Sequence, residues 1–241
     1  MALPKIDTPI YELDLPLSKK HIKFRPFLVK EQKNLLMAME AEDVETVERN
    51  VRQVLNNCTI TEDIDIDKLP VIDVEYYFIQ LRARSVGEVV ENDYICNNQV
   101  EGKECGGKMK GTLNLLDIKV DIPAESQDVI KLTDKISMKL KYPEFSLVDK
   151  ISQKENDIDI VFEIIAESVE YIFDGEQYYH GHETPKAEIL QFIESLSQEQ
   201  FSKLEQFFDN LPSLNKTMQI KCGKCGFDHS ITMEGLESFF E

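Results

Sequence analysis

Alternating apolar and polar residues near the start of the chain predict a β-hairpin. Residues 11–15 and 22–26 alternate in this way, and the polar segment 17–20 between them suits a turn. From 30 to 42 and from 44 to 55 the apolar residues recur every three or four positions, which is the spacing of one helical face. We therefore expect two strands followed by two helices that pair with each other.

The middle of the chain changes from helical spacing to strand alternation. Residues 70–84 begin with a proline and place apolar residues on one side, which predicts a buried helix. Between 86 and 120 the apolar positions alternate and glycine-rich turns separate them, as in a β-segment. Residues 130–132 and 136–142 predict a further hairpin, which Pro143 ends.

The last third of the chain returns to helices and then to strands. A wide apolar stripe predicts one helix from 157 to 173. Thr184 is expected to cap a helix that runs to 196, and a capping box starts the next helix at Ser197. Strands are expected on both sides of the cysteines near 222. The chain as a whole is predicted to be an α+β protein of helical blocks and antiparallel β-hairpins.

The chain is strongly acidic. It has 45 Asp and Glu residues against 27 Lys and Arg residues, and its formal net charge of −18 repels phosphate backbones and anionic lipids. We therefore expect neither a nucleic-acid nor a membrane partner. No stretch approaches the roughly 20 apolar residues that span a bilayer, and residues 1–7 lack a secretion-signal pattern. In a reducing cell interior, the five cysteines are expected to be metal ligands or free thiols.

Two pairs of cysteines carry the clearest chemical signal. Cys222 and Cys225, in the sequence Cys-Gly-Lys-Cys-Gly, have the spacing of a zinc knuckle, in which two thiolates face one metal. Cys96 and Cys105 also follow a strand pattern and precede a glycine, although segment 97–103 between them must bulge out as a surface loop. Four such ligands complete a tetrahedral Zn²⁺ shell and leave no position for water. The sequence therefore predicts a structural zinc site.

The zinc site also bears on how the chain is divided. The two cysteine pairs are more than about a hundred residues apart, so one metal would close a long loop. We expect a single intertwined domain over residues 1–241. Within it, about 86–120 and 215–234 are expected to form a zinc-bound β-subdomain.

Other interpretations of these residues remain open. The four cysteines could be reduced thiols, or Cys222 and Cys225 could form a redox pair, although such a pair normally begins a helix. His229 could replace Cys105 as the fourth ligand. Cys58 is most simply a small buried apolar side chain.

Candidates for catalysis are few. The chain has no glycine-rich phosphate loop, no nucleophile elbow and no His-Glu-x-x-His motif. His180 and His182 alternate near Asp174 and could seat a labile metal, which makes a metal-dependent hydrolase the alternative function. The main expectation is a protein without enzymatic activity and without a small-molecule substrate.

Some apolar residues are more numerous than a core requires. The Phe and Leu residues between 192 and 211 exceed one helical stripe, so most are expected in the core and a surplus on the surface. Leu236, Phe239 and Phe240 near the end of the chain add to this surplus. An exposed patch of this kind fits a protein that acts by association.

Several segments resemble one known family over nearly the full chain. They are Ala2–Pro9 with Tyr11–Leu13, Lys23–Lys33, Asp73–Tyr76, Leu81–Glu88, Ile130–Asp134 and Glu234–Glu241. In these segments the chain is similar to the T4-like bacteriophage baseplate protein family. Each of them is a structural motif and none is a functional signature.

The resemblance implies a part in building the baseplate hub of a contractile-tailed phage. The chain would be either a hub subunit of the virion tail or an assembly factor, a transient chaperone, that leaves the finished particle. Its partners would be other baseplate hub proteins, and homo-oligomerisation is left open. Its location would be the host cytoplasm during assembly, and the virion if it stays in the baseplate.

Overall fold

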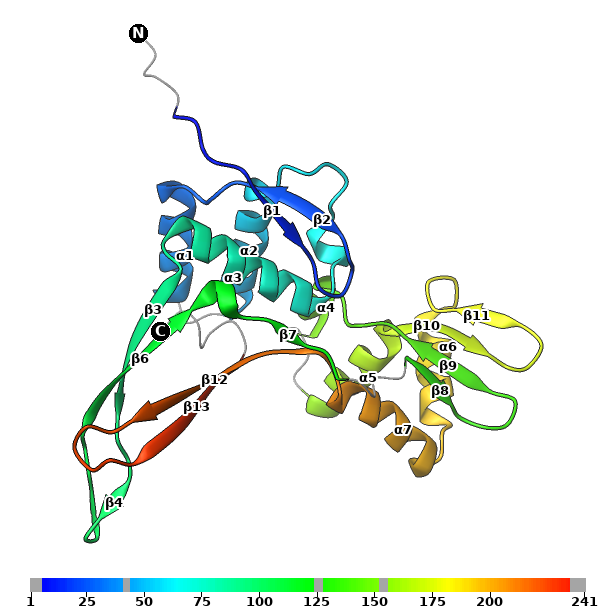
Figure 1. Ribbon diagram of the computed structural model, residues 1–241. Helices are drawn as coiled ribbons and strands as arrows, with labels where there is room; N and C mark the ends of the chain where they lie inside the picture. The colour runs from blue at the N-terminus through cyan, green and yellow to red at the C-terminus, as the bar shows by residue number, and fades with distance from the viewer. Residues whose placement is uncertain (1–5, 41–43, 124–127, 152–155, 235–241) are drawn as a thin grey trace. The chain divides into compact units, whose positions relative to one another are not determined.

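The computed structural model describes residues 6–40, 44–123, 128–151 and 156–234. The chain divides into two compact units, each built from segments that are distant in sequence. Unit 1 comprises residues 1–64, 75–121 and 213–241, and unit 2 comprises residues 65–74 and 122–212. Helices and antiparallel strands are mixed in this chain, in agreement with the α+β prediction (Figure 1). The single intertwined domain over 1–241 stays a prediction.

The N-terminal part of unit 1 is a β-hairpin against helices. β1 (Tyr11–Asp14) pairs antiparallel with β2 (His21–Phe24), as the alternation predicts. α1 (Val29–Glu40) and α2 (Val44–Cys58) follow and pack on each other, and α3 (Val71–Ser85) belongs to unit 1 from residue 75 onward. The Phe24 ring meets the Tyr77 ring edge-on, with centroids 5.3 Å apart, so the hairpin and α3 share one core.

A buried carboxylate fixes the start of α1. Glu31 is 2% exposed and accepts hydrogen bonds from the Leu28 N–H at 2.8 Å and from Arg25 Nη2 at 3.1 Å. Burial alone would raise the pKa of Glu31, but these two hydrogen bonds and the Arg25 charge hold it below its ordinary value. The ionised side chain therefore joins the end of β2 to the first turn of α1.

Two hairpins form the rest of unit 1, and we call them together the arm. β3 (Val89–Ile95) pairs with β6 (Lys108–Asn114), and β12 (Ser213–Lys221) pairs with β13 (Asp228–Glu234). Short strands β4 (Gln99–Val100) and β5 (Lys103–Glu104) pair at the end of the first hairpin, and β7 (Val120–Asp121) pairs with the start of β12. The turn η2 (Leu115–Asp117) follows β6. Figure 1 shows β4 at the far end of the arm.

The two hairpins pack face to face. A Cβ atom at Gly111 of β6 would lie 2.7 Å from the Tyr94 ring and 2.8 Å from Ile220 Cδ1, so a larger residue there would displace these two side chains. At the base of the arm, Val90, Leu113 and Met233 are buried in one apolar cluster. The arm is therefore held at its base by hydrophobic contacts.

Unit 2 is one antiparallel sheet with helices on one face. The strand order is β11 (Tyr178–His180), β10 (Val169–Phe173), β9 (Ser137–Leu140) and β8 (Val129–Lys131). The turn η1 (Ile66–Lys68) and the helices α4 (Ser146–Ile151), α5 (Asp157–Glu167), α6 (Lys186–Glu194) and α7 (Gln198–Asp209) complete it. Ile130, Met138 and Ile172 of the sheet pack with helix residues such as Ile189 and Leu204.

Three expectations for this region were wrong. The helix expected from 157 to 173 ends at Glu167, because Val169–Phe173 finds strand partners in β9 and β11 and forms a central strand instead. Thr184 is not the cap of α6; its hydroxyl donates to the His180 carbonyl, and Pro185 occupies the cap position. The surplus Phe and Leu residues of 192–211 pack against the core and make no exposed patch.

Other expectations were confirmed or lie outside the described residues. The capping box at Ser197 is present, with Gln200 as its partner. Leu236, Phe239 and Phe240 lie outside the described residues. No described helix is long and apolar enough to cross a membrane.

The buried Glu31 carboxylate gives the first testable prediction. For Glu31→Gln we expect the free energy of unfolding at pH 7 to fall by about 2–3 kcal/mol, because Arg25 loses its buried partner. The folded-state pKa of Glu31 lies below its ordinary value of 4.5. Its contribution is therefore present above that value and is lost as the pH falls through the folded pKa. Urea unfolding followed by circular dichroism at several pH values would show the difference shrinking below about pH 4.5.

The matched control is Glu12→Gln. Glu12 pairs with Lys23 at 2.9 Å, but its side chain is 56% exposed, so we expect a clearly smaller loss of stability than in Glu31→Gln. A loss in Glu31→Gln no larger than that in Glu12→Gln would contradict the structural role of Glu31.

Candidate metal centre

Four cysteines meet near the outer end of the arm, just before the β4–β5 hairpin. Cys96 directly follows β3 and Cys105 shortly precedes β6. Pairing of these two strands therefore brings Cys96 and Cys105 together. Cys222 directly follows β12, and Cys225 lies in the turn before β13. The four Sγ atoms all lie within 4.8 Å of one another. The structure thus brings together all four cysteines that the sequence selects.

The distances between the sulfur atoms suit a tetrahedral metal site. Cys96 Sγ lies 3.6 Å from Cys225 Sγ, and Cys105 Sγ lies 3.8 Å from Cys222 Sγ. A tetrahedron with Zn–S bonds of about 2.3 Å places its sulfur atoms about 3.8 Å apart, whereas a disulfide requires about 2.05 Å. The four side chains therefore match the donor set and the size of a Zn²⁺ site.

The backbone forms the same turn around both cysteine pairs. The Gly106 N–H donates to the Cys96 carbonyl at 2.9 Å, and the Gly226 N–H donates to the Cys222 carbonyl at 2.9 Å. Each glycine follows the second cysteine of its pair and has a left-handed φ, +61° for Gly106 and +77° for Gly226. The long loop between Cys96 and Cys105 forms the β4–β5 hairpin, so it does not change the turn at these two cysteines.

Each sulfur atom accepts at least one backbone N–H. The donors are Asn98 for Cys96, Gly107 for Cys105, Lys224 and Cys225 for Cys222, and Phe227 for Cys225. Amides that point at sulfur stabilise the thiolate over the thiol, and the same arrangement is the usual second shell of a zinc knuckle.

The two cysteine pairs differ in their acidity. The Phe227 N–H lowers the pKa of Cys225 to about 6, and the Cys225 and Lys224 amides also lower the pKa of Cys222. Burial raises the pKa of Cys96 to about 12 and also raises the pKa of Cys105. Four adjacent sulfur atoms cannot all carry a negative charge unless a cation joins them.

Gly107 lies against the sulfur cluster and leaves no room for a side chain. A Cβ atom there would be 2.8 Å from Cys222 Sγ, 3.1 Å from Lys224 Cβ and 3.4 Å from Cys105 Sγ. The Gly-Gly step after Cys105 therefore has two roles: Gly106 makes the turn, and Gly107 lets the second hairpin approach.

The geometry bears on a histidine ligand, a redox pair and the role of Cys58. His229 lies beside the cluster, with Nε2 3.1 Å from Cys96 Sγ, while Cys105 Sγ is one of the four sulfur atoms that lie within 4.8 Å of one another. Cys222 and Cys225 lie in a turn between two strands, whereas a redox pair normally begins a helix. Cys58 is fully buried, and burial raises the pKa of its thiol to about 11, as expected of an apolar core residue.

The two histidines proposed for a labile metal do not gather further ligands. The rings of His180 and His182 have centroids 5.6 Å apart, and His180 stacks on Tyr178. The His182 side chain is 76% exposed and lies 3.5 Å from Glu183. Across the described residues, the four cysteines are the group of three or more ligand side chains close enough to share a metal.

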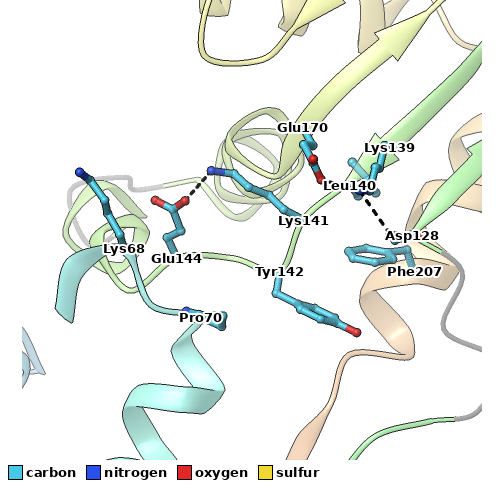
Figure 2. Close-up of a pocket in the computed structure, with 10 residues that line it drawn as sticks. All are labelled: Lys68, Pro70, Asp128, Lys139, Leu140, Lys141, Tyr142, Glu144, Glu170 and Phe207. Atoms are coloured by element: carbon cyan, nitrogen blue, oxygen red, sulfur yellow. Dashed lines mark hydrogen bonds and ion pairs between the residues drawn. The ribbon is translucent and has the colours of Figure 1, made fainter. Parts of the chain in front are cut away.

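Unit 2 also contains a pocket of about 530 Å³ (Figure 2). Its charged side chains neutralise one another: Lys141 lies 2.6 Å from Glu144, and Lys139 lies 3.1 Å from Glu170. The hydrogen bond to Glu170 raises the pKa of Lys139, whereas a nucleophilic lysine requires a lowered pKa. The pKa shift of Lys139 is therefore opposite to the one that a nucleophilic lysine needs.

Sequence reasoning missed the residues that surround the sulfur atoms. Asn98 Nδ2 lies 3.7 Å from Cys225 Sγ, and Lys224 Nζ donates to the Cys105 carbonyl. Neither residue type indicates a metal site by itself. Their position inside or beside the two cysteine turns is the one signal that could have identified them.

Comparison with known proteins places the chain in a family. Residues 8–241 match the sequence model of the family described as T4 bacteriophage base plate protein. The chain is 25% identical over 232 residues to the baseplate hub assembly protein gp26 of Enterobacteria phage T4, covering 96% of this chain and 98% of that protein. No solved structure matches. Since the match spans nearly the whole length, the chain belongs to the T4 bacteriophage base plate protein family.

Proposed function

We propose that this protein takes part in assembly of the phage baseplate hub through protein–protein contacts and without catalysis. The proposal is supported by the similarity to a baseplate hub assembly protein over 96% of the chain. Its partners would be other baseplate proteins, encountered in the infected host cell. We propose an assembly factor and not a permanent hub subunit, because the similar protein is named for hub assembly.

The proposal includes a structural zinc ion bound by the arm. The observation that carries it is the set of four sulfur atoms within 4.8 Å of one another. Cys96, Cys105, Cys222 and Cys225 would be the ligands, and four thiolates fill a tetrahedral shell and exclude water. When bound, the ion supplies a crosslink and no chemistry on a substrate. A labile metal at His180 and His182 has no comparable support in the described residues.

The crosslink would act where the arm has little other support. A two-stranded hairpin is marginally stable alone, and around the cysteines the buried cluster is small: Met109 with Tyr94 and Ile220 packed against it. A metal that joins the ends of β3 and β12 would therefore fix the two hairpins relative to each other. A rigid arm loses less conformational entropy when it binds a partner.

The assembly role predicts the phenotype of a phage that lacks this chain. We expect infection with such a deletion to yield no finished hub and no complete tails, and expression of the chain in trans to restore them. Mass spectrometry of finished tails from wild-type infection should find the hub subunits and not this chain. Normal tails from the deletion would contradict the role, and the chain in stoichiometric amounts in tails would make it a hub subunit.

The zinc site predicts the metal content of the purified chain. Wild-type protein prepared without added metal should contain about one zinc per chain by inductively coupled plasma mass spectrometry. Cys222→Ser should lose the zinc and lower the stability of the arm, because it removes one of four ligands. Cys58→Ser is the matched control, since Cys58 is buried elsewhere, and it should keep the metal. Wild-type protein free of zinc would contradict the site.

Gly107 predicts a second way to damage the centre with every cysteine present. In Gly107→Ala the new methyl group would lie 2.8 Å from Cys222 Sγ, so we expect zinc affinity to fall by about 10-fold or more. Gly223→Ala is the control, because nothing lies within 4 Å of a Cβ at that position. Competition with a chromophoric chelator measures both affinities. Equal affinities would show that the hairpins do not approach as closely as described.

A further inference from the structure

Three polar contacts connect the two hairpins around the sulfur cluster. His229 of β13 reaches Cys96 Sγ with Nε2 at 3.1 Å, and Asn98 of the first hairpin reaches Cys225 Sγ at 3.7 Å. Lys224 of the second hairpin donates to the Cys105 carbonyl. Of these, His229 makes the shortest contact to a sulfur atom, and its partner Cys96 is fully buried.

We propose that His229 is a positioning residue of the metal centre: its Nε2–H donates to the Cys96 thiolate and holds β13 against the end of β3. This inference rests on the proposed zinc site and adds a residue that lies outside the four ligands. His229 itself does not bind the ion, since the four cysteines fill the tetrahedron.

With zinc bound to Cys96, the contact would require a proton on one particular nitrogen of His229. A zinc-bound thiolate has no proton, so Cys96 Sγ can only accept a hydrogen bond. The nitrogen 3.1 Å away is Nε2, and it must therefore be the donor. The contact fixes the Nε2–H form of the ring, just as hydrogen bonds fix the tautomer of histidines around other metal sites.

The surroundings of His229 suit a fixed orientation. The Phe227 ring meets the His229 ring edge-on, with centroids 4.8 Å apart and an interplanar angle of 71°. Phe227 also donates its backbone N–H to Cys225 Sγ, so one segment orients both a ligand and the histidine. Zinc with four thiolates keeps a net negative charge, and a donor placed at a buried thiolate offsets part of it.

Three variants separate the hydrogen bond from the bulk of the ring. His229→Phe keeps the ring but removes the donor, and His229→Gln provides an N–H near the position of Nε2. His182→Phe is the matched control, since His182 is an exposed loop histidine in unit 2. Each full-length variant is loaded with Zn²⁺ for transfer to a chromophoric chelator, and with Co²⁺ for its thiolate charge-transfer spectrum.

The expected result is a loss of zinc affinity in His229→Phe of about 10- to 100-fold. His229→Gln should recover part of this loss, and His182→Phe should behave as wild type. The cobalt spectrum of His229→Phe should keep the intensity of four thiolates while its charge-transfer bands shift, because one thiolate loses its hydrogen bond. A role in packing alone would leave the band positions unchanged.

Three other outcomes would overturn the inference, and each has a different consequence for the zinc site. Unchanged zinc affinity and an unchanged cobalt spectrum in His229→Phe would overturn the inference while the zinc site stands. A wild-type cobalt spectrum of three thiolates and one imidazole, lost in His229→Phe, would overturn it by making His229 a ligand. Wild-type protein that binds neither metal would overturn the zinc site and this inference together.

Discussion

Sulfur atoms from two hairpins converge within 4.8 Å of one another near the outer end of the arm, and this contact joins the hairpins where few other buried side chains do. At the base, residues such as Val90, Leu113 and Met233 form an apolar cluster that holds the hairpins together. Toward the end the apolar cluster becomes small, and four cysteines take its place. Burying four adjacent sulfur atoms without a cation would leave thiols close together with few other contacts. A metal crosslink is the arrangement that suits both the distances and the surroundings.

The two cysteine pairs differ in sequence spacing, but the backbone places their sulfur atoms in the same way. The knuckle at Cys222 is short, and the one at Cys96 contains an extra hairpin, β4–β5. Both end in a left-handed glycine whose N–H returns to the first cysteine carbonyl. The insertion therefore changes the length of the loop and not the position of the sulfur atoms. Loop length costs little free energy when the ends of the loop are fixed by strands.

This geometry fits a protein that works by making contacts. A site of four thiolates has no coordination position for substrate, and the pocket of unit 2 has charged groups that neutralise one another. The chain belongs to a family of base plate proteins, and the protein to which it is similar is named for hub assembly, which agrees with the proposed role. The outer ring of His229, Asn98 and Lys224 would then serve to hold the arm in one shape.

The sequence by itself determined the α+β class, most hairpins and helices, and the choice of the four cysteines, because hydrophobic period and ligand spacing are local properties. It did not determine that 157–173 breaks into α5 and β10, since pairing of Val169–Phe173 with β9 and β11 is a long-range contact that overrides local periodicity. Nor could it assign the roles of Gly107 and His229, which depend on the approach of a hairpin more than a hundred residues away in the chain. Only the tertiary structure decides such contacts, because they join two hairpins that lie far apart in the sequence.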